Sequence, residues 1–209
     1  MLQFDGPLSF REFMTHEELP LATLFRDVLE FLTSRPDAVL FGAQAVNAYC
    51  ETARMTHDID LLSTDAAGLA EALRGHLAER FHIAVRVREV ADQQGFRVYQ
   101  VRKPKNRHLI DVRQTPSLPE HRLIEKVLVI APVELIAMKV QSLSARRNRP
   151  KGDTDRADLR RLLLALPDLR VAVGAVSARL AALGVSESAQ ALWLELVQEP
   201  LEADVDDEY

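Results

Sequence analysis

Two aspartates that flank a single apolar residue are the first candidates for chemistry in this sequence. Asp58 and Asp60 fall within residues 57–63, a segment whose pattern predicts a β-strand. Because side chains alternate along a strand, both carboxylates share one face. A third acid, Asp111, interrupts the apolar run of another predicted strand, residues 109–113. Aspartate is depleted in strands and neighbouring carboxylates repel one another, so the three acids predict a site for a divalent cation, Mg²⁺ or alternatively Mn²⁺.

The alternative for Asp58 and Asp60 is a solvated position on the exposed face of an edge strand. A glycine turn upstream favours the cation site. The apolar run 38–41 stops at Gly42, and helix-forming residues follow over 43–52. Glycine lets a phosphate approach the backbone, and a helix start offers free N–H groups. Ala43 carries no hydroxyl, so backbone N–H groups are the expected phosphate donors.

The composition is that of a globular protein. The chain has 209 residues, 47% of them hydrophobic and 27% charged, with a formal net charge of −5. Residues 1–13 lack a secretory signal pattern, and no apolar run approaches the ~18 residues that span a bilayer. A single cysteine excludes an internal disulfide. These features predict a cytoplasmic protein without a membrane partner.

Positive charge is concentrated in two segments. The first basic loop, residues 102–108, contains Arg102, Lys103, Lys105, Arg107 and His108; the second, residues 146–151, contains Arg146, Arg147, Arg149 and Lys151. On charge alone, both loops are interpreted as solvated surface. The end of the chain, residues 201–209, is an acidic tail.

The periodicity predicts an α/β half followed by an all-helical half. Helical patterns cover residues 17–34 and 65–81, with Asp65 as a cap for the second. Strand patterns follow at 82–90, 95–102, 109–113 and 123–130. Further helices are predicted from Pro132 onward, and at 155–166, 171–183 and 187–197. The predicted organisation is a mixed-sheet α/β domain over residues 1–131, a helical bundle over 132–200, and the acidic tail.

Several of these motifs together resemble a known superfamily. The segments LFGAQA (40–45) and RMTHDIDL (54–61) resemble the nucleotidyltransferase superfamily to which DNA polymerase beta belongs. The RxTxDID spelling looks closest to the abortive-infection, type IV toxin nucleotidyltransferases. PVELIAMK (132–139), ARR (145–147) and DRADL (155–159) resemble the lysine helix and the downstream DxxDL helix of that branch. The likeness covers about residues 38–165, and Ala43 departs from the serine or glycine that is frequent there.

The resemblance implies roles for individual residues. The implied catalytic residues are Asp58, Asp60, Asp111 and Lys139, and the three aspartates are also the implied metal ligands. The implied nucleotide-binding residues are Gly42, Ala43, Arg54, Thr56, Asp155 and Asp158. Other readings stay open for some of them. Lys139 could simply extend from an apolar helix face to solvent, Asp155 and Asp158 could form a helix-capping pair, and Arg54 and Thr56 could only hold the turn in place.

The implied activity is transfer of a nucleoside monophosphate from a nucleoside triphosphate to an acceptor. Three acceptors fit this activity. They are a tRNA 3′ end bound through the two basic loops, a small molecule such as an antibiotic, and a protein hydroxyl. A toxin of this branch also implies a cognate antitoxin protein. The alternative is that the protein is not an enzyme but a non-catalytic binding module with the nucleotidyltransferase fold.

Overall fold

A computed structural model describes residues 19–90 and 94–202, and these residues form two compact units. The sheet unit comprises the described residues through Ala48 together with Thr52–Ile130. The helical unit comprises Tyr49–Glu51 and the described residues from Ala131 onward. The start of the first predicted helix, the amino-terminal stretch and residues 203–209 of the acidic tail lie outside the described residues.

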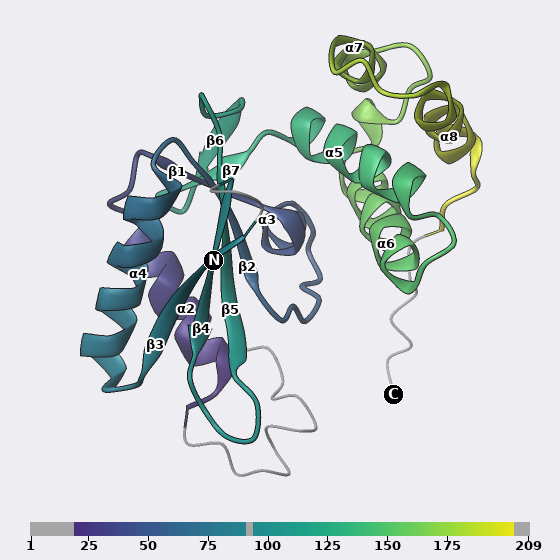
Figure 1. Cartoon of the computed structure of the whole chain (residues 1–209). Helices are drawn as coiled ribbons and strands as arrows, with labels where there is room; N and C mark the ends of the chain where they lie inside the picture. The colour runs from purple at the N-terminus through teal and green to yellow at the C-terminus, as the bar shows by residue number, and fades with distance from the viewer. Residues whose placement is uncertain (1–18, 91–93, 203–209) are drawn as a thin grey trace. The chain divides into compact units, whose positions relative to one another are not determined.

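The sheet unit is built on a seven-stranded mixed sheet with the order β3-β4-β5-β2-β1-β7-β6 (Figure 1). The strands are β1 (Ala38–Phe41), β2 (Ile59–Ser63), β3 (Val85–Val90), β4 (Gly95–Gln100), β5 (Arg107–Gln114), β6 (His121–Ile124) and β7 (Val127–Ile130). Two neighbouring pairs, β2–β5 and β1–β7, are parallel, and the other pairs are antiparallel. The prediction of a mixed α/β fold is confirmed.

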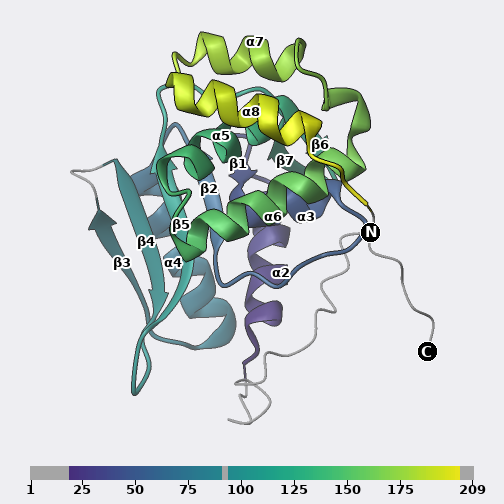
Figure 2. The same cartoon turned by 90° about the vertical axis from the view of Figure 1, so that its right-hand side faces the viewer.

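Helices α2 (Leu21–Leu32) and α4 (Ala66–Phe81) lie side by side on one face of the sheet (Figure 1 and Figure 2). The predicted cap of α4 is present, because the side chain of Asp65 accepts a hydrogen bond from the backbone N–H of Gly68. Ile59 and Leu61 of β2 are fully buried, whereas Asp60 between them is only half-buried. The strand therefore places Ile59 and Leu61 in the core and Asp60 on the opposite face.

The segment predicted as one strand, 123–130, is instead a hairpin of β6 and β7. Glu125 and Lys126 form its two-residue turn, and both have positive φ angles, 47° and 70°. Positive φ at both central residues matches the twist of paired strands. Such turns usually contain asparagine and glycine, so Glu-Lys gave no turn signal in the sequence.

The helical unit contains α5 (Pro132–Ala145), α6 (Pro150–Ala165), the 3₁₀ turn η1 (Pro167–Leu169), α7 (Ala175–Ala182) and α8 (Glu187–Gln198). Pro132 occupies the first turn of α5 as predicted. The predicted start of α6 was wrong: the helix begins at Pro150, and its N-cap is Arg149. Asp155 is therefore an interior residue of α6, and the capping pair of Asp155 with Asp158 does not exist.

Within residues 19–90 and 94–202, the structure contains no helix that is long and apolar enough to cross a bilayer.

Candidate active site

Two of the predicted carboxylates lie on neighbouring strands, and the third directly precedes one of these strands. Asp60 of β2 is the register partner of Asp111 on the parallel strand β5, and Asp58 directly precedes β2. Register partners of neighbouring strands point to the same face. The sheet therefore brings together acids that are about fifty positions apart in the sequence, because the parallel pairing of β2 with β5 aligns them.

A histidine that the sequence analysis assigned to the first basic loop belongs to this group instead. His108 lies three positions before Asp111, a spacing that puts two side chains on opposite faces of a regular strand. The β4–β5 register shifts between the pairs Val98↔Ile110 and Tyr99↔His108, so Leu109 is an extra, bulged residue. This β-bulge returns His108 to the face that carries Asp111.

The side chains of Asp58, His108 and Asp111 converge. Nδ1 of His108 lies 3.5 Å from Oδ2 of Asp58, and Nε2 lies 3.2 Å from Oδ1 of Asp111. Each of the three residues offers a ligand atom within 4.8 Å of the other two. Nε2 is buried. The donor set, one imidazole and two carboxylates, fits a bound divalent cation.

Positive groups balance the negative charge of the half-buried Asp111. Nε of Arg97, on β4, donates a hydrogen bond to Oδ1 of Asp111 at 2.8 Å. Burial alone raises the pKa of Asp111, but the opposing effects of His108 and Arg97 are stronger and the net pKa is lowered. Burial likewise lowers the pKa of His108, and the carboxylates of Asp111 and Asp58 overcome this effect, so its net pKa is raised.

The glycine turn lies against the second aspartate. Gly42 begins helix α3 (Gly42–Tyr49) with a φ angle of +68°, in the left-handed region that disfavours other residues. A Cβ atom at this position would lie 2.0 Å from Oδ2 of Asp60. The absence of a side chain at Gly42 is what allows the Asp60 carboxylate to rest beside the start of α3. Ala43 is the second residue of this helix.

The segment before Asp58 is held by side-chain hydrogen bonds from α3. The hydroxyl of buried Thr56 accepts from Nε2 of Gln44 at 3.2 Å and donates to the backbone oxygen of Asp58 at 3.0 Å. The amide of Asn47 bonds both the N–H and the carbonyl of Arg54, at 3.0 and 2.9 Å. These contacts favour the reading in which Arg54 and Thr56 hold the turn that leads into Asp58.

Lys139 is held within the helical unit by two buried acids. Its Nζ donates to Oδ1 of Asp155 at 3.1 Å and to Oδ2 of Asp158 at 2.6 Å. The side chains of Asp155 and Asp158 are 4% and 0% exposed, and Nε of Arg146 donates to the other oxygen of Asp155 at 2.7 Å. Lys139 therefore does not extend to solvent, and the two acids face its ammonium group.

Solved structures with a similar backbone identify the fold. The Megavirus polyadenylate synthase matches with a TM-score of 0.59 and 12% identity, over 70% of this chain but only 32% of the synthase. JHP933 from Helicobacter pylori matches with a TM-score of 0.52 and 15% identity, over 91% of this chain and 90% of the other. A nucleotidyltransferase-like antigenic protein from Paracoccidioides brasiliensis gives 0.50 and 19%, over 92% and 90%. The fold is that of the nucleotidyltransferases.

The family can be stated more narrowly. The sequence model described as the nucleotidyl transferase AbiEii toxin of type IV toxin–antitoxin systems matches residues 23–182. The chain belongs to this family, and it is a nucleotidyltransferase. The branch suggested by the sequence motifs is thereby confirmed. A comparison with curated proteins found no match.

We expect Gly42→Ala to damage the site and the fold together. The strained φ angle is expected to cost about 1–2 kcal/mol of unfolding free energy. Displacement of the Asp60 carboxylate is expected to lower the transferase rate by roughly 100-fold. Denaturant unfolding and nucleotide transfer assays measure the two effects. Gly75→Ala is the matched control, because a Cβ there meets nothing within 4 Å and alanine is the better helix former. Equal activity of Gly42→Ala and wild type would contradict the described packing.

We expect Asp158→Asn to destabilise the helical unit, because it removes one partner from a buried ion pair. The expected loss is about 3 kcal/mol of unfolding free energy. Asp153→Asn in the exposed first turn of α6 is the control, and its loss should stay below about 1 kcal/mol. Thermal and denaturant unfolding give both values. Similar losses for the two variants would show that the pairing of Lys139 with Asp158 contributes little.

Proposed function

We propose that this nucleotidyltransferase moves a nucleoside monophosphate from a nucleoside triphosphate to an RNA acceptor, with Asp58, Asp60 and Asp111 holding the divalent cation. The single observation that carries the proposal is the pairing of Asp60 with Asp111 beside the glycine turn at Gly42. A bound Mg²⁺ or Mn²⁺ ion supplies positive charge that orients the triphosphate and lowers the pKa of the attacking hydroxyl.

The residues of the chain contribute mainly by positioning. The backbone N–H groups at Gly42 and Ala43 bind phosphate oxygens at the start of α3. In this proposal Asp111 accepts the proton of the acceptor hydroxyl. Arg54 and Thr56 act by holding the turn that leads into Asp58. Phosphoryl transfer requires little covalent chemistry from the protein. The placement of these charges therefore accounts for most of the rate acceleration.

Lys139 keeps its expected role as the positive partner of the triphosphate, which comes from the sequence resemblance. In this proposal Asp155 and Asp158 act by positioning the Lys139 ammonium and do not contact the nucleotide directly. Their burial and their contacts to Nζ support that assignment. Family membership also supports a cognate antitoxin as a partner of this protein.

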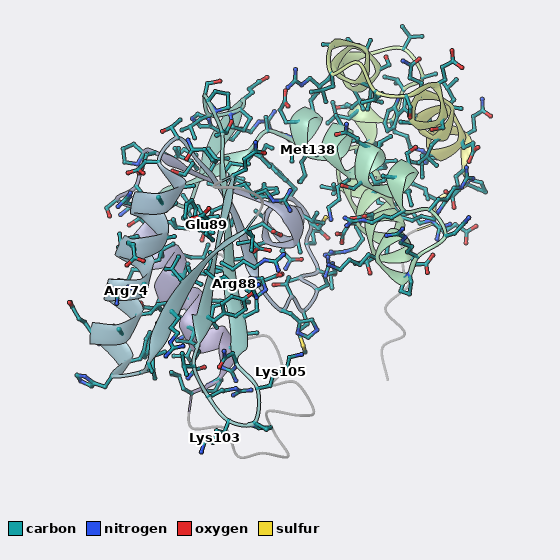
Figure 3. All side chains as sticks on the ribbon, in the orientation of Figure 1. Arg74, Arg88, Glu89, Lys103, Lys105 and Met138 are labelled. Carbon is teal, nitrogen blue, oxygen red and sulfur yellow. The ribbon has the colours of Figure 1, made fainter. Side chains whose placement is uncertain are left out.

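A row of arginines beside the carboxylates supports an RNA acceptor. In the sheet register, Arg88 of β3 lies opposite Arg97 of β4, and Arg97 lies opposite Asp111 of β5. The three side chains therefore share one face of the sheet. Arg86, two positions before Arg88, lies on the same face, and both side chains are exposed. Lys103 and Lys105 lie at the tip of the connection between β4 and β5 (Figure 3). Exposed cations that flank a phosphoryl-transfer site suit a polyanionic acceptor better than a cationic drug.

The transfer reaction is tested with labelled nucleoside triphosphates, total cellular RNA, and Mg²⁺ or Mn²⁺. We expect Asp58→Asn and Asp60→Asn each to lose at least roughly 100-fold of the wild-type rate, because the cation loses a carboxylate. Asp168→Asn, an exposed position in η1, is the control with wild-type activity. Equal label transfer by wild type and both site variants would refute the assignment of these carboxylates.

The RNA acceptor is tested separately by binding of fluorescent tRNA across a salt titration. Arg86→Ala/Arg88→Ala is expected to lower the slope of log affinity against log salt by about 1.4, or ~0.7 for each phosphate that an arginine neutralises. Arg74→Ala is the matched control, since Arg74 lies on α4 and pairs with Glu71. An unchanged slope in the double variant would reject this surface as the RNA-binding surface and favour a small-molecule acceptor.

A further inference from the structure

A nitrogen donor lies among the carboxylates of the sheet unit. The extra residue Leu109 is the reason that His108 faces Asp58 and Asp111 at all, because without the bulge the ring would point to the opposite face. Bulges cost regular pairing, and they are concentrated at sites where a side chain must be aimed. The bulge in β5 therefore sets the direction of the His108 imidazole.

We propose that His108 is a ligand of the cation in this site, and that its nitrogen makes the site prefer a divalent transition-metal ion, such as Mn²⁺, over Mg²⁺. The inference rests on the proposed function, since it concerns the same cation. Mg²⁺ takes almost exclusively oxygen ligands, whereas imidazole is a good ligand for transition-metal ions. An imidazole added to the carboxylates therefore discriminates between ions that carboxylates alone would bind more evenly.

The ring of His108 is placed as a ligand requires. Two ligands bound at right angles at about 2.1 Å from one ion lie roughly 3 Å apart. The separation of 3.5 Å between Nδ1 of His108 and Oδ2 of Asp58 is close to that value. The ring of Tyr99 lies against the imidazole with a centroid distance of 5.1 Å, which limits the rotation of the imidazole.

Charge compensation alone does not account for His108. Arg97 already donates to the carboxylate of Asp111 at 2.8 Å, so that acid has a permanent cationic partner. Nε2 of His108 is buried and lies 3.2 Å from the same carboxylate. In metal sites, the second nitrogen of a histidine ligand commonly faces a carboxylate that orients the ring. His108 lies between two carboxylates, so whichever nitrogen binds the ion, the other keeps such a partner.

The direct test is electron spin echo envelope modulation of Mn²⁺ bound to the full-length protein with inorganic tripolyphosphate. Tripolyphosphate contains no nitrogen, so strong ¹⁴N modulation can come only from the protein. We expect the wild type to show the coupling of a directly bound imidazole, and ¹⁵N-histidine labelling to change it to the ¹⁵N pattern. Wild-type protein that binds Mn²⁺ without this modulation would overturn the inference, and this result needs no variant.

Variants test the preference between ions. By calorimetry, His108→Ala is expected to weaken Mn²⁺ binding at least ~10-fold and Mg²⁺ binding less than ~3-fold. His121→Ala, at an exposed position of β6, is the control and should leave both affinities unchanged. Equal losses for the two ions in His108→Ala would also overturn the inference. Failure of the proposed function is distinguishable, because Asp58→Asn would then leave Mn²⁺ and Mg²⁺ binding and label transfer at wild-type levels.

Discussion

The parallel pairing of β2 with β5 is the constraint on which the sheet unit depends. It sets Asp60 beside Asp111 and thereby brings like charges to neighbouring strands. At a separation of roughly 5 Å and an effective dielectric constant of ~20, two such charges repel by about 3 kcal/mol. On the other face the same register pairs fully buried apolar residues, Ile59 with Ile110 and Leu61 with Val112. Each of these contributes about 1.5–3 kcal/mol on burial, so the apolar face outweighs the repulsion and fixes the acids in place.

The bulge at Leu109 and the identity of residue 108 depend on each other. A regular β5 would turn the His108 ring to the apolar face, where no carboxylate of this group could meet it. With the bulge, the ring lies between Asp58 and Asp111, and Arg97 and Tyr99 on β4 line the same face. The one-residue bulge at Leu109 thus determines whether the imidazole nitrogen of His108 joins the three carboxylates of the site.

Much of the fold could be predicted from the sequence because its signals are local. Alternation predicted β3 and β4, the helical period and Asp65 predicted α4, and the apolar run around Asp111 predicted β5. What failed depends on partners distant in the sequence or on unusual turn residues. The register shift opposite Leu109 is decided by pairing with β4, so nothing near His108 indicated its direction. The turn at Glu125 and Lys126 lacked glycine, and the interior position of Asp155 followed from a helix start at Pro150.

The helical unit also brings two carboxylates together, and there both of them are buried. Two buried carboxylates, Asp155 and Asp158, would be costly alone, since an uncompensated buried charge loses several kcal/mol of solvation. Lys139 contacts both acids, Arg146 adds a second cation at Asp155, and Arg161 lies 4.0 Å from Asp158. These three cations compensate the charge of the two buried acids. Because Lys139 contacts both carboxylates, its ammonium group is fixed in position when the helical unit folds, and the side-chain entropy that this costs is offset by the two buried ion pairs.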